Sequence, residues 1–280
     1  MVAQNLSVSQ KPVDRLRDTE NRSSIRDLIN SRELLLTWAR REFRVRYSQS
    51  VMGAAWAIFQ PLVLMIIFTL VFSYILPTDT GSIPYPVFSY AGTLTWTLFA
   101  NSLTFAIPSL VANMNLVSKI YFPREILPIA SVLVGLVDFV IASLLFIPLL
   151  IAYQVPVGPA ILFVPLIVLV QTAFTIALSL FASAVNVFFR DVRFVVPLGL
   201  QIWMYLSPII YPLERVPESL RPIYMLNPMA TLIDSYRRAI LFNQMPNWPY
   251  FALTTLVSLV ALILAYRYFK RMEREFADVI

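Results

Sequence analysis

The chain has 280 residues, of which 58% are hydrophobic and only 14% are charged, and its formal net charge is +6. Soluble domains carry about 25% charged residues, so this composition excludes an ordinary soluble domain. The absence of Cys and His excludes disulfides and removes the commonest metal ligand and general base. The six glycines form no phosphate-binding loop. We therefore expect no catalytic residue, no metal site and no cofactor in this chain, and no enzymatic activity.

The N-terminal 50 residues are polar at first and amphipathic later. We expect residues 1–22 to form a flexible cytoplasmic N-terminus and residues 23–49 to form a helix. Ser24 and Asp27 resemble a capping box at the start of this helix. From Ile25 to Tyr47, apolar residues recur on one helical face and arginines on the other. This pattern is typical of a helix in the membrane interface, and a cytosolic helix packed on another protein is the alternative.

Two long stretches without charge predict several membrane spans. No charged residue occurs from Thr80 to Ser118 or from Phe139 to Phe189. A charge at the centre of a bilayer costs at least about 2.5–3.5 kcal/mol, and about 20 apolar residues in a helix cross the hydrocarbon core. One permease domain, residues 50–272, then contains six predicted spans, which are residues 51–76, 87–108, 126–153, 160–189, 194–212 and 250–269.

The predicted fold class is therefore an all-α membrane protein with six transmembrane helices and a tail at residues 273–280. In this arrangement 18 of the 22 Lys and Arg residues fall on one side of the membrane. Because basic residues accumulate on the cytoplasmic side, we expect both termini to be cytoplasmic.

Asp138 is the one formal charge near the middle of a predicted span, since Arg267 lies two residues before the end of the last one. An intramembrane carboxylate suggests a functional role, here a proton relay or a hydrogen-bond partner for a sugar. The alternative is a carboxylate that locks two helices together. Because no second intramembrane charge completes a relay, we favour the interpretation that the Asp138 carboxylate holds two helices together.

The loop before the last span, residues 213–249, is partly apolar. Ile223–Ile233 is too short to span and is interrupted at Asn227-Pro228, so we predict a re-entrant hairpin of two short helices that gates the outer mouth. A passive outer cap is the alternative. We expect Arg237 and Arg238 to lie at the interface or to contact phosphate groups of cargo or lipid.

Five strings of the sequence resemble a known family. They are RYSQSVMGAAWAIFQP from Arg46, NMNLVSKIYFPREILP from Asn113, NVFFRDVRFVVP from Asn186, SPIIYP from Ser207 and NPMATLIDSYRRAI from Asn227. In this order they resemble the permease subunits of ABC transporters that export bacterial polysaccharides, namely the O-antigen, capsule and teichoic-acid exporters of the type-two ABC permease family. The resemblance covers nearly all of Ile25–Met272.

The resemblance implies half of a transporter in the bacterial inner membrane. It implies two copies of the chain with two copies of a separate ABC ATPase subunit that binds ATP and Mg, and a lipid-linked polysaccharide as cargo. Membrane lipids are the other expected partners, and nucleic acid is not expected. We favour O-antigen over capsule or teichoic acid. A small-lipid or drug exporter of the same family is a further alternative. A proton-coupled secondary transporter and a membrane enzyme for polyprenyl lipids are alternatives from other classes.

The resemblance also implies candidate site residues. The segment after the second span is similar to a cytoplasmic coupling helix that docks on the ATPase, with a plain interfacial turn as the alternative. Its candidates are Asn113, Leu116, Lys119, Phe122, Pro123, Arg124 and Glu125. The first and fifth spans line the path in the family, and aromatic faces stack on sugar rings. The channel candidates are Trp56, Phe59, Trp96, Phe99, Trp203 and Tyr205, each of which could instead face lipid or the core. The outer-gate candidates are Ser207, Pro208, Tyr211, Asn227, Pro228, Arg237 and Arg238.

Overall fold

The computed structural model describes residues 31–48, 50–117, 119 and 122–276. The predicted N-terminal segment 1–22, the capping box at Ser24 and Asp27, and the last four residues of the predicted tail lie outside this range. The all-α class is confirmed, since the elements of the described residues are all helices. Four helical stretches are long and apolar enough to cross a membrane, namely Gly53–Ile75, Ile126–Ala152, Pro159–Phe188 and Trp248–Glu275.

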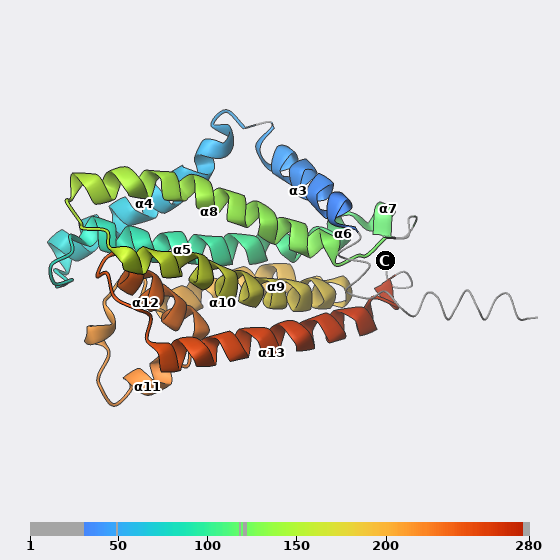
Figure 1. Cartoon of the computed structure of the whole chain (residues 1–280). Coiled ribbons are helices and arrows are strands. Elements are labelled where there is room, and N and C mark those ends of the chain that lie inside the picture. Colours follow the sequence, from blue (N-terminus) through green and yellow to red (C-terminus); the bar gives the residue numbers. More distant parts are fainter. Residues whose placement is uncertain (1–30, 49, 118, 120–121, 277–280) are drawn as a thin grey trace, which may run out of the picture.

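Long helices run side by side through the molecule (Figure 1). They are α4 (Trp56–Leu70), α5 (Tyr85–Ala106), α8 (Ile126–Ala152), α9 (Val164–Phe188), α10 (Val192–Tyr205) and α13 (Trp248–Met272). Short 3₁₀ turns precede α4 at Gly53–Ala55 and α9 at Pro159–Phe163, and a π-helical turn at Val71–Ile75 extends α4. The amphipathic helix α3 (Arg32–Tyr47) lies oblique to them and packs on α8.

Two of the six predicted spans are not among the four apolar stretches. Helix α5 is long enough, but it is rich in Thr and Ser and is buried over most of its length. Its Thr hydroxyls donate to carbonyls one turn back, as those of Thr95 and Thr97 do. Helix α10 ends at Tyr205, so the predicted segment 194–212 is helical only in its first part. Proline at positions 208 and 212 prevents the helix from continuing.

Short helices gather at the two ends of the bundle (Figure 1). At the end near the C-terminus lie α6 (Ser109–Ala112) and α7 (Met114–Val117), and at the opposite end lie α11 (Arg221–Tyr224) and α12 (Pro228–Ile240). A 3₁₀ turn at Leu213–Arg215 precedes α11. The predicted hairpin thus contains two short helices that are separated at Asn227. Its depth in a membrane stays a prediction.

Helices α5 and α8 approach each other closely because α8 carries a glycine at the contact. A Cβ atom built on Gly135 would lie 2.1 Å from the hydroxyl oxygen of Ser102 on α5. Small residues let helices in a membrane pack backbone to backbone, which maximises dispersion contacts. This contact brings α8 against the central helix α5.

We predict that Gly135→Val destabilises the protein, because the added side chain cannot fit against Ser102. Overpacking of this kind costs about 1–3 kcal/mol, which is measurable as the free energy of unfolding in mixed detergent micelles. Adding Ser102→Gly should restore part of the loss. Equal stability of Gly135→Val and the parent chain would contradict the close approach.

Candidate functional site

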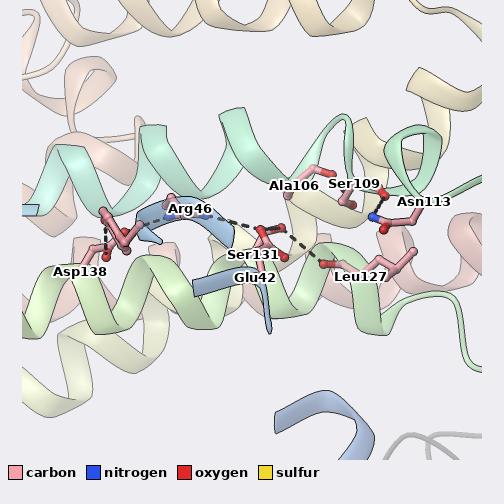
Figure 2. Close-up of polar contacts among 9 residues, drawn as sticks. Glu42, Arg46, Ala106, Ser109, Asn113, Leu127, Ser131 and Asp138 are labelled. Atoms are coloured by element: carbon pink, nitrogen blue, oxygen red, sulfur yellow. Dashed lines mark hydrogen bonds and ion pairs between the residues drawn. The ribbon is translucent and has the colours of Figure 1, made fainter. Parts of the chain in front are cut away.

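A network of charged and polar side chains joins α3 to α8 (Figure 2). Glu42 and Arg46 lie one turn apart on α3, and they face Ser131 and Asp138 of α8. The guanidinium of Arg46 binds Asp138 at 2.9 Å and Glu42 at 3.5 Å. The Tyr47 hydroxyl donates to Asp138 at 2.8 Å, and the Ser131 hydroxyl donates to Glu42 at 2.6 Å. Helix α3 is thereby fixed along the first half of α8.

The ion pair at the centre of this network is largely shielded from solvent. The side chains of Arg46 and Asp138 are 10% and 12% exposed. The guanidinium also lies 3.7 Å from the ring centre of Phe105. Burial raises the pKa of the Glu42 carboxyl. Both oxygens of Asp138 have partners, which agrees with the helix lock favoured from the sequence. The sequence analysis assigned no role to Arg46 or Glu42, although their spacing of four residues on a helix was a usable signal.

A second polar cluster ties the predicted coupling segment to the end of α13. Glu125 is 1% exposed and binds the Lys270 ammonium at 2.6 Å. Lys270 also binds Glu273 at 2.9 Å, and the Arg124 guanidinium donates to the Glu273 carbonyl at 2.6 Å. Burial raises the pKa of the Glu125 carboxyl. Arg124 and Glu125 therefore make contacts within this chain, because they lie at the start of α8 next to the last turn of α13.

The other coupling candidates are spread along the same segment. Asn113 donates to the Ser109 carbonyl at 2.8 Å (Figure 2), and Leu116 and Pro123 are half-buried. The ring of Phe122 stacks on Trp38 of α3 at 6.3 Å between centroids. Lys119 is exposed. The segment thus touches α3 at Phe122 and α13 at Glu125, and it leaves Lys119 available to a partner.

Half of the predicted channel aromatics form a cluster inside the helical bundle. Trp96 and Phe99 of α5 are buried, and both contact Trp203 of α10, with ring centroids 6.5 and 5.3 Å away. Phe174 of α9 packs on Phe99 and Trp203. In this conformation Trp96 and Phe99 are covered by the chain's own helices. Both rings are covered because α5, the Thr-rich helix that carries them, packs against neighbours on nearly every side.

The remaining aromatic candidates are exposed. Trp56 and Phe59 of α4 contact each other edge to face at 5.3 Å, and Tyr205 lies at the end of α10. All three are at least 40% exposed. These three candidates present their rings at the surface of the chain, and Trp203 is half-buried.

Asn227 joins the outer hairpin to α10. Its side-chain oxygen accepts from the Met229 backbone at 3.1 Å and caps α12, with Pro228 in the first turn. The same oxygen accepts from the Trp203 indole at 2.9 Å, and the amide donates to the Ser207 hydroxyl at 3.1 Å. One predicted gate residue thus bonds directly to one predicted channel residue.

The other gate candidates also make contacts within the hairpin region. The hydroxyls of Tyr211 and Tyr224 lie 2.9 Å apart. Arg238 is half-buried and donates to the Met245 carbonyl at 3.0 Å. These contacts close the hairpin on itself at the end of the bundle.

Arg237 is buried within the chain, and its predicted location at the membrane interface or on phosphate groups of cargo or lipid stays a prediction. It is 4% exposed, and its guanidinium donates to the carbonyls of Phe88, Pro208 and Ile209. The Ile209 bond measures 2.6 Å. The guanidinium carbon lies 3.5 Å from the ring centre of Phe88. A Cβ atom on Gly92 would lie 2.6 Å from the guanidinium, so this glycine makes room for it.

The physical reason is the broken end of α10. Residues 206–212 have left the helix, and buried carbonyls there lack helical partners. An unpaired buried carbonyl is costly. Arginine offers five donors in a rigid fork, so one side chain satisfies carbonyls from α5 and from the segment after α10. Sequence reasoning missed this, because nothing in the local pattern reveals which carbonyls a distant arginine meets.

Comparisons with known proteins agree on one family. The profile described as "ABC-2 type transporter" matches residues 33–242. The O-antigen export system permease protein RfbA of Myxococcus xanthus is 32% identical over 259 residues, which is 91% of this chain and 98% of that protein. Its namesake in Klebsiella pneumoniae is 29% identical over 253 residues, or 89% and 95% of the two chains. The polysialic acid transport protein KpsM of Escherichia coli is 23% identical over 238 residues, or 81% and 90%.

We predict that Asp138→Ala strongly destabilises the protein, because it leaves the Arg46 charge buried and only partly paired. Removing one partner of a buried ion pair costs about 3–5 kcal/mol, measured as the free energy of unfolding in mixed micelles. Asp138→Asn should cost less, since an amide still accepts from Tyr47.

The matched control is Glu218→Ala, which removes an ion pair whose carboxylate is 90% exposed. Exposed pairs contribute little, so this variant should match the parent chain. An Asp138→Ala protein as stable as the Glu218→Ala protein would rule out the lock.

We also predict that Arg237→Lys loosens the outer hairpin, because a lysine ammonium cannot reach three carbonyls as the fork does. Each lost charge-assisted hydrogen bond is worth about 1.5–3 kcal/mol. Faster cleavage by protease between residues 213 and 228 would report the loosening. Arg238→Lys loses one bond of a half-buried side chain and should change cleavage little. Identical cleavage rates in both variants would contradict the conclusion that the Arg237 guanidinium holds the hairpin through these carbonyls.

Proposed function

The chain belongs to the ABC-2 type transporter family, and on that basis we propose that it is the permease subunit of an O-antigen exporter. The cargo is a lipid-linked polysaccharide that moves outward across the bacterial inner membrane. The observation that carries the proposal is the 32% identity with an O-antigen export permease over 91% of this chain and 98% of that one. The chain performs no catalysis in this proposal, and a separate ATPase subunit binds ATP and Mg.

A capsule exporter is the second candidate, because the polysialic acid transport protein is similar over 81% of the chain. Its identity of 23% is lower than the 28–32% of the O-antigen permeases. The difference favours O-antigen as cargo. In both cases the substrate class is a bacterial polysaccharide.

In the proposed assembly two copies of the chain enclose the path, with two ATPase subunits on the cytoplasmic side. Six helices span the membrane, since α5 and α10 run alongside the four apolar stretches. Helix α5 needs little lipid-facing surface, because its neighbours cover it. The Lys and Arg bias orients both termini toward the cytoplasm, and α11 and α12 then lie at the outer end.

The contacts described above suggest how ATP-driven motion reaches the bundle. A push on the coupling segment is transmitted to α3 through Phe122 and Trp38 and to α13 through Glu125 and Lys270. Helix α3 passes the motion to α8 through Arg46 and Asp138. At the outer end, α12 moves together with α5 and the segment after α10, because Arg237 binds carbonyls of both.

The test is display of polysaccharide at the cell surface. A strain of the host bacterium that lacks this chain should make the polysaccharide but keep it inside, and the parent chain should restore display. Phe122→Asp should insert in the membrane but fail to restore display or to retain the ATPase subunit on purification, because a charge replaces the apolar docking residue. Phe122→Leu should restore both, because it keeps an apolar side chain.

Three outcomes would contradict different parts of the proposal. Unchanged surface display in the strain without this chain would refute polysaccharide export. Normal display with Phe122→Asp would refute the coupling role alone. Failure of Phe122→Leu together with Phe122→Asp would assign the effect to lost stacking on Trp38 and not to docking.

A further inference from the structure

An open cavity of about 270 Å³ lies where α3, α4, α5 and α8 meet. Arg46 and Asp138, labelled in Figure 2, belong to its wall. Pockets for small molecules measure about 300–1,000 Å³, so this cavity is at the lower limit and suits a single ring-sized group. It is too small for a lipid headgroup together with its acyl chains.

Two side-chain amides face each other in the wall of this cavity. Gln60 of α4 and Asn101 of α5 exchange hydrogen bonds of 3.0 and 3.4 Å. Each amide has two N–H donors and an oxygen with two lone pairs, so the pair retains donors and acceptors for a third molecule. Amides next to hydrocarbon are costly unless they are paired or line a wet cavity. Both amides line the cavity, where water or a ligand can use the remaining donors and acceptors.

An aromatic ring is fixed beside these amides. The indole N–H of Trp56 donates to the Ser50 hydroxyl at 3.0 Å, and Phe59 packs against the ring at 89°. The ring is 45% exposed and also lines the cavity. A fixed, exposed indole offers an apolar face next to hydrogen-bonding groups. A ring with hydroxyl groups at its edge and C–H bonds on its face can bind the amides through its hydroxyl groups and the indole through its face.

The charges of the cavity argue against an anionic ligand. Arg46 is bound by Asp138 and Glu42 and lies against Phe105. Two carboxylates thus neutralise the one guanidinium in the cavity wall, which leaves it no positive charge to bind a phosphate. A neutral group with several hydroxyls meets no such repulsion. Hydrogen bonding, an aromatic face and neutrality together select a sugar ring.

We infer that this cavity binds one sugar unit of the exported polysaccharide. The inference rests on the proposed function, because it takes its ligand from the cargo of the exporter. The amides of Gln60 and Asn101 bind hydroxyls, and Trp56 covers one face of the ring. The site connects the cargo to α3, since Arg46 and Tyr47 form part of the same wall. A bound sugar therefore touches the helix that contacts the coupling segment.

The test uses protection of a single thiol, because the chain has no cysteine of its own. Ala57→Cys places a small reactive group in the cavity wall, and N-ethylmaleimide measures its accessibility in membranes. The matched control is Ala261→Cys, which lines an apolar groove between α9 and α13. Membranes come from cells that contain the lipid-linked polysaccharide, and from cells blocked in its synthesis that contain only the sugar-free lipid carrier.

With polysaccharide present, alkylation at position 57 should slow about tenfold if the cargo stands at ten times its dissociation constant. Position 261 should not respond. Adding Gln60→Ala and Asn101→Ala should raise the dissociation constant about tenfold, since each lost hydrogen bond is worth roughly a factor of three. The slowing of alkylation at position 57 should then fall from about tenfold to about twofold. Protection with the sugar-free carrier alone would overturn the inference in favour of a lipid site. Protection that survives removal of both amides would also overturn it.

Failure of this inference is distinguishable from failure of the proposed function. If surface display depends on the chain while position 57 reacts equally in both membranes, the sugar site is refuted and export stands. If display is independent of the chain, export itself is refuted.

Discussion

Every polar group buried in a bilayer must find its partner inside the protein, and this constraint organises the structure. Hydrocarbon offers no hydrogen bonds, so an unpaired group costs several kcal/mol. Three polar contacts meet this requirement. Arg46 pairs with Asp138 between α3 and α8, and Glu125 pairs with Lys270 where the start of α8 meets the end of α13. Arg237 binds the carbonyls near the end of α10. Elsewhere apolar and small residues pack between the helices, together with single hydrogen bonds such as the one from the Gln171 amide to the Thr95 carbonyl.

These polar contacts divide the bundle into two groups of segments, each joined by ion pairs or charged hydrogen bonds. At one end α3, α8 and α13 are joined to the predicted coupling segment. At the other end Arg237 joins α12 to α5 and to the segment after α10. The close approach of α8 to α5 at Gly135 joins the two groups. The cavity beside Asp138 lies between α8 and α5 as well. The predicted coupling segment and the predicted hairpin are thus connected through packed helices.

The sequence predicted the helices well and their partners poorly. Uncharged runs and proline positions predicted where helices lie, and the break at Asn227 follows from the proline after it. The length of α10 was overestimated, because apolar residues after Tyr205 do not reveal that the chain unwinds there. The burial of Arg237 against backbone carbonyls was not predicted, since the rule that puts arginine at a membrane surface ignores carbonyls that a broken helix exposes. Asp138 was recognised as special, but its partner Arg46 lies 92 residues earlier, and no local pattern links two such positions.

The polar side chains of α5 affect how the protein is inserted into the membrane. It lies at the centre of the bundle, and its Thr and Ser side chains exclude it from the four stretches apolar enough to cross a membrane by themselves. The ribosome delivers α5 before α8 and α9, the neighbours that later cover it. Each exposed hydroxyl makes entry of a nascent segment into lipid less favourable. We therefore expect α5 to enter the bilayer together with α8 and α9, which cover its polar side chains, and not by itself.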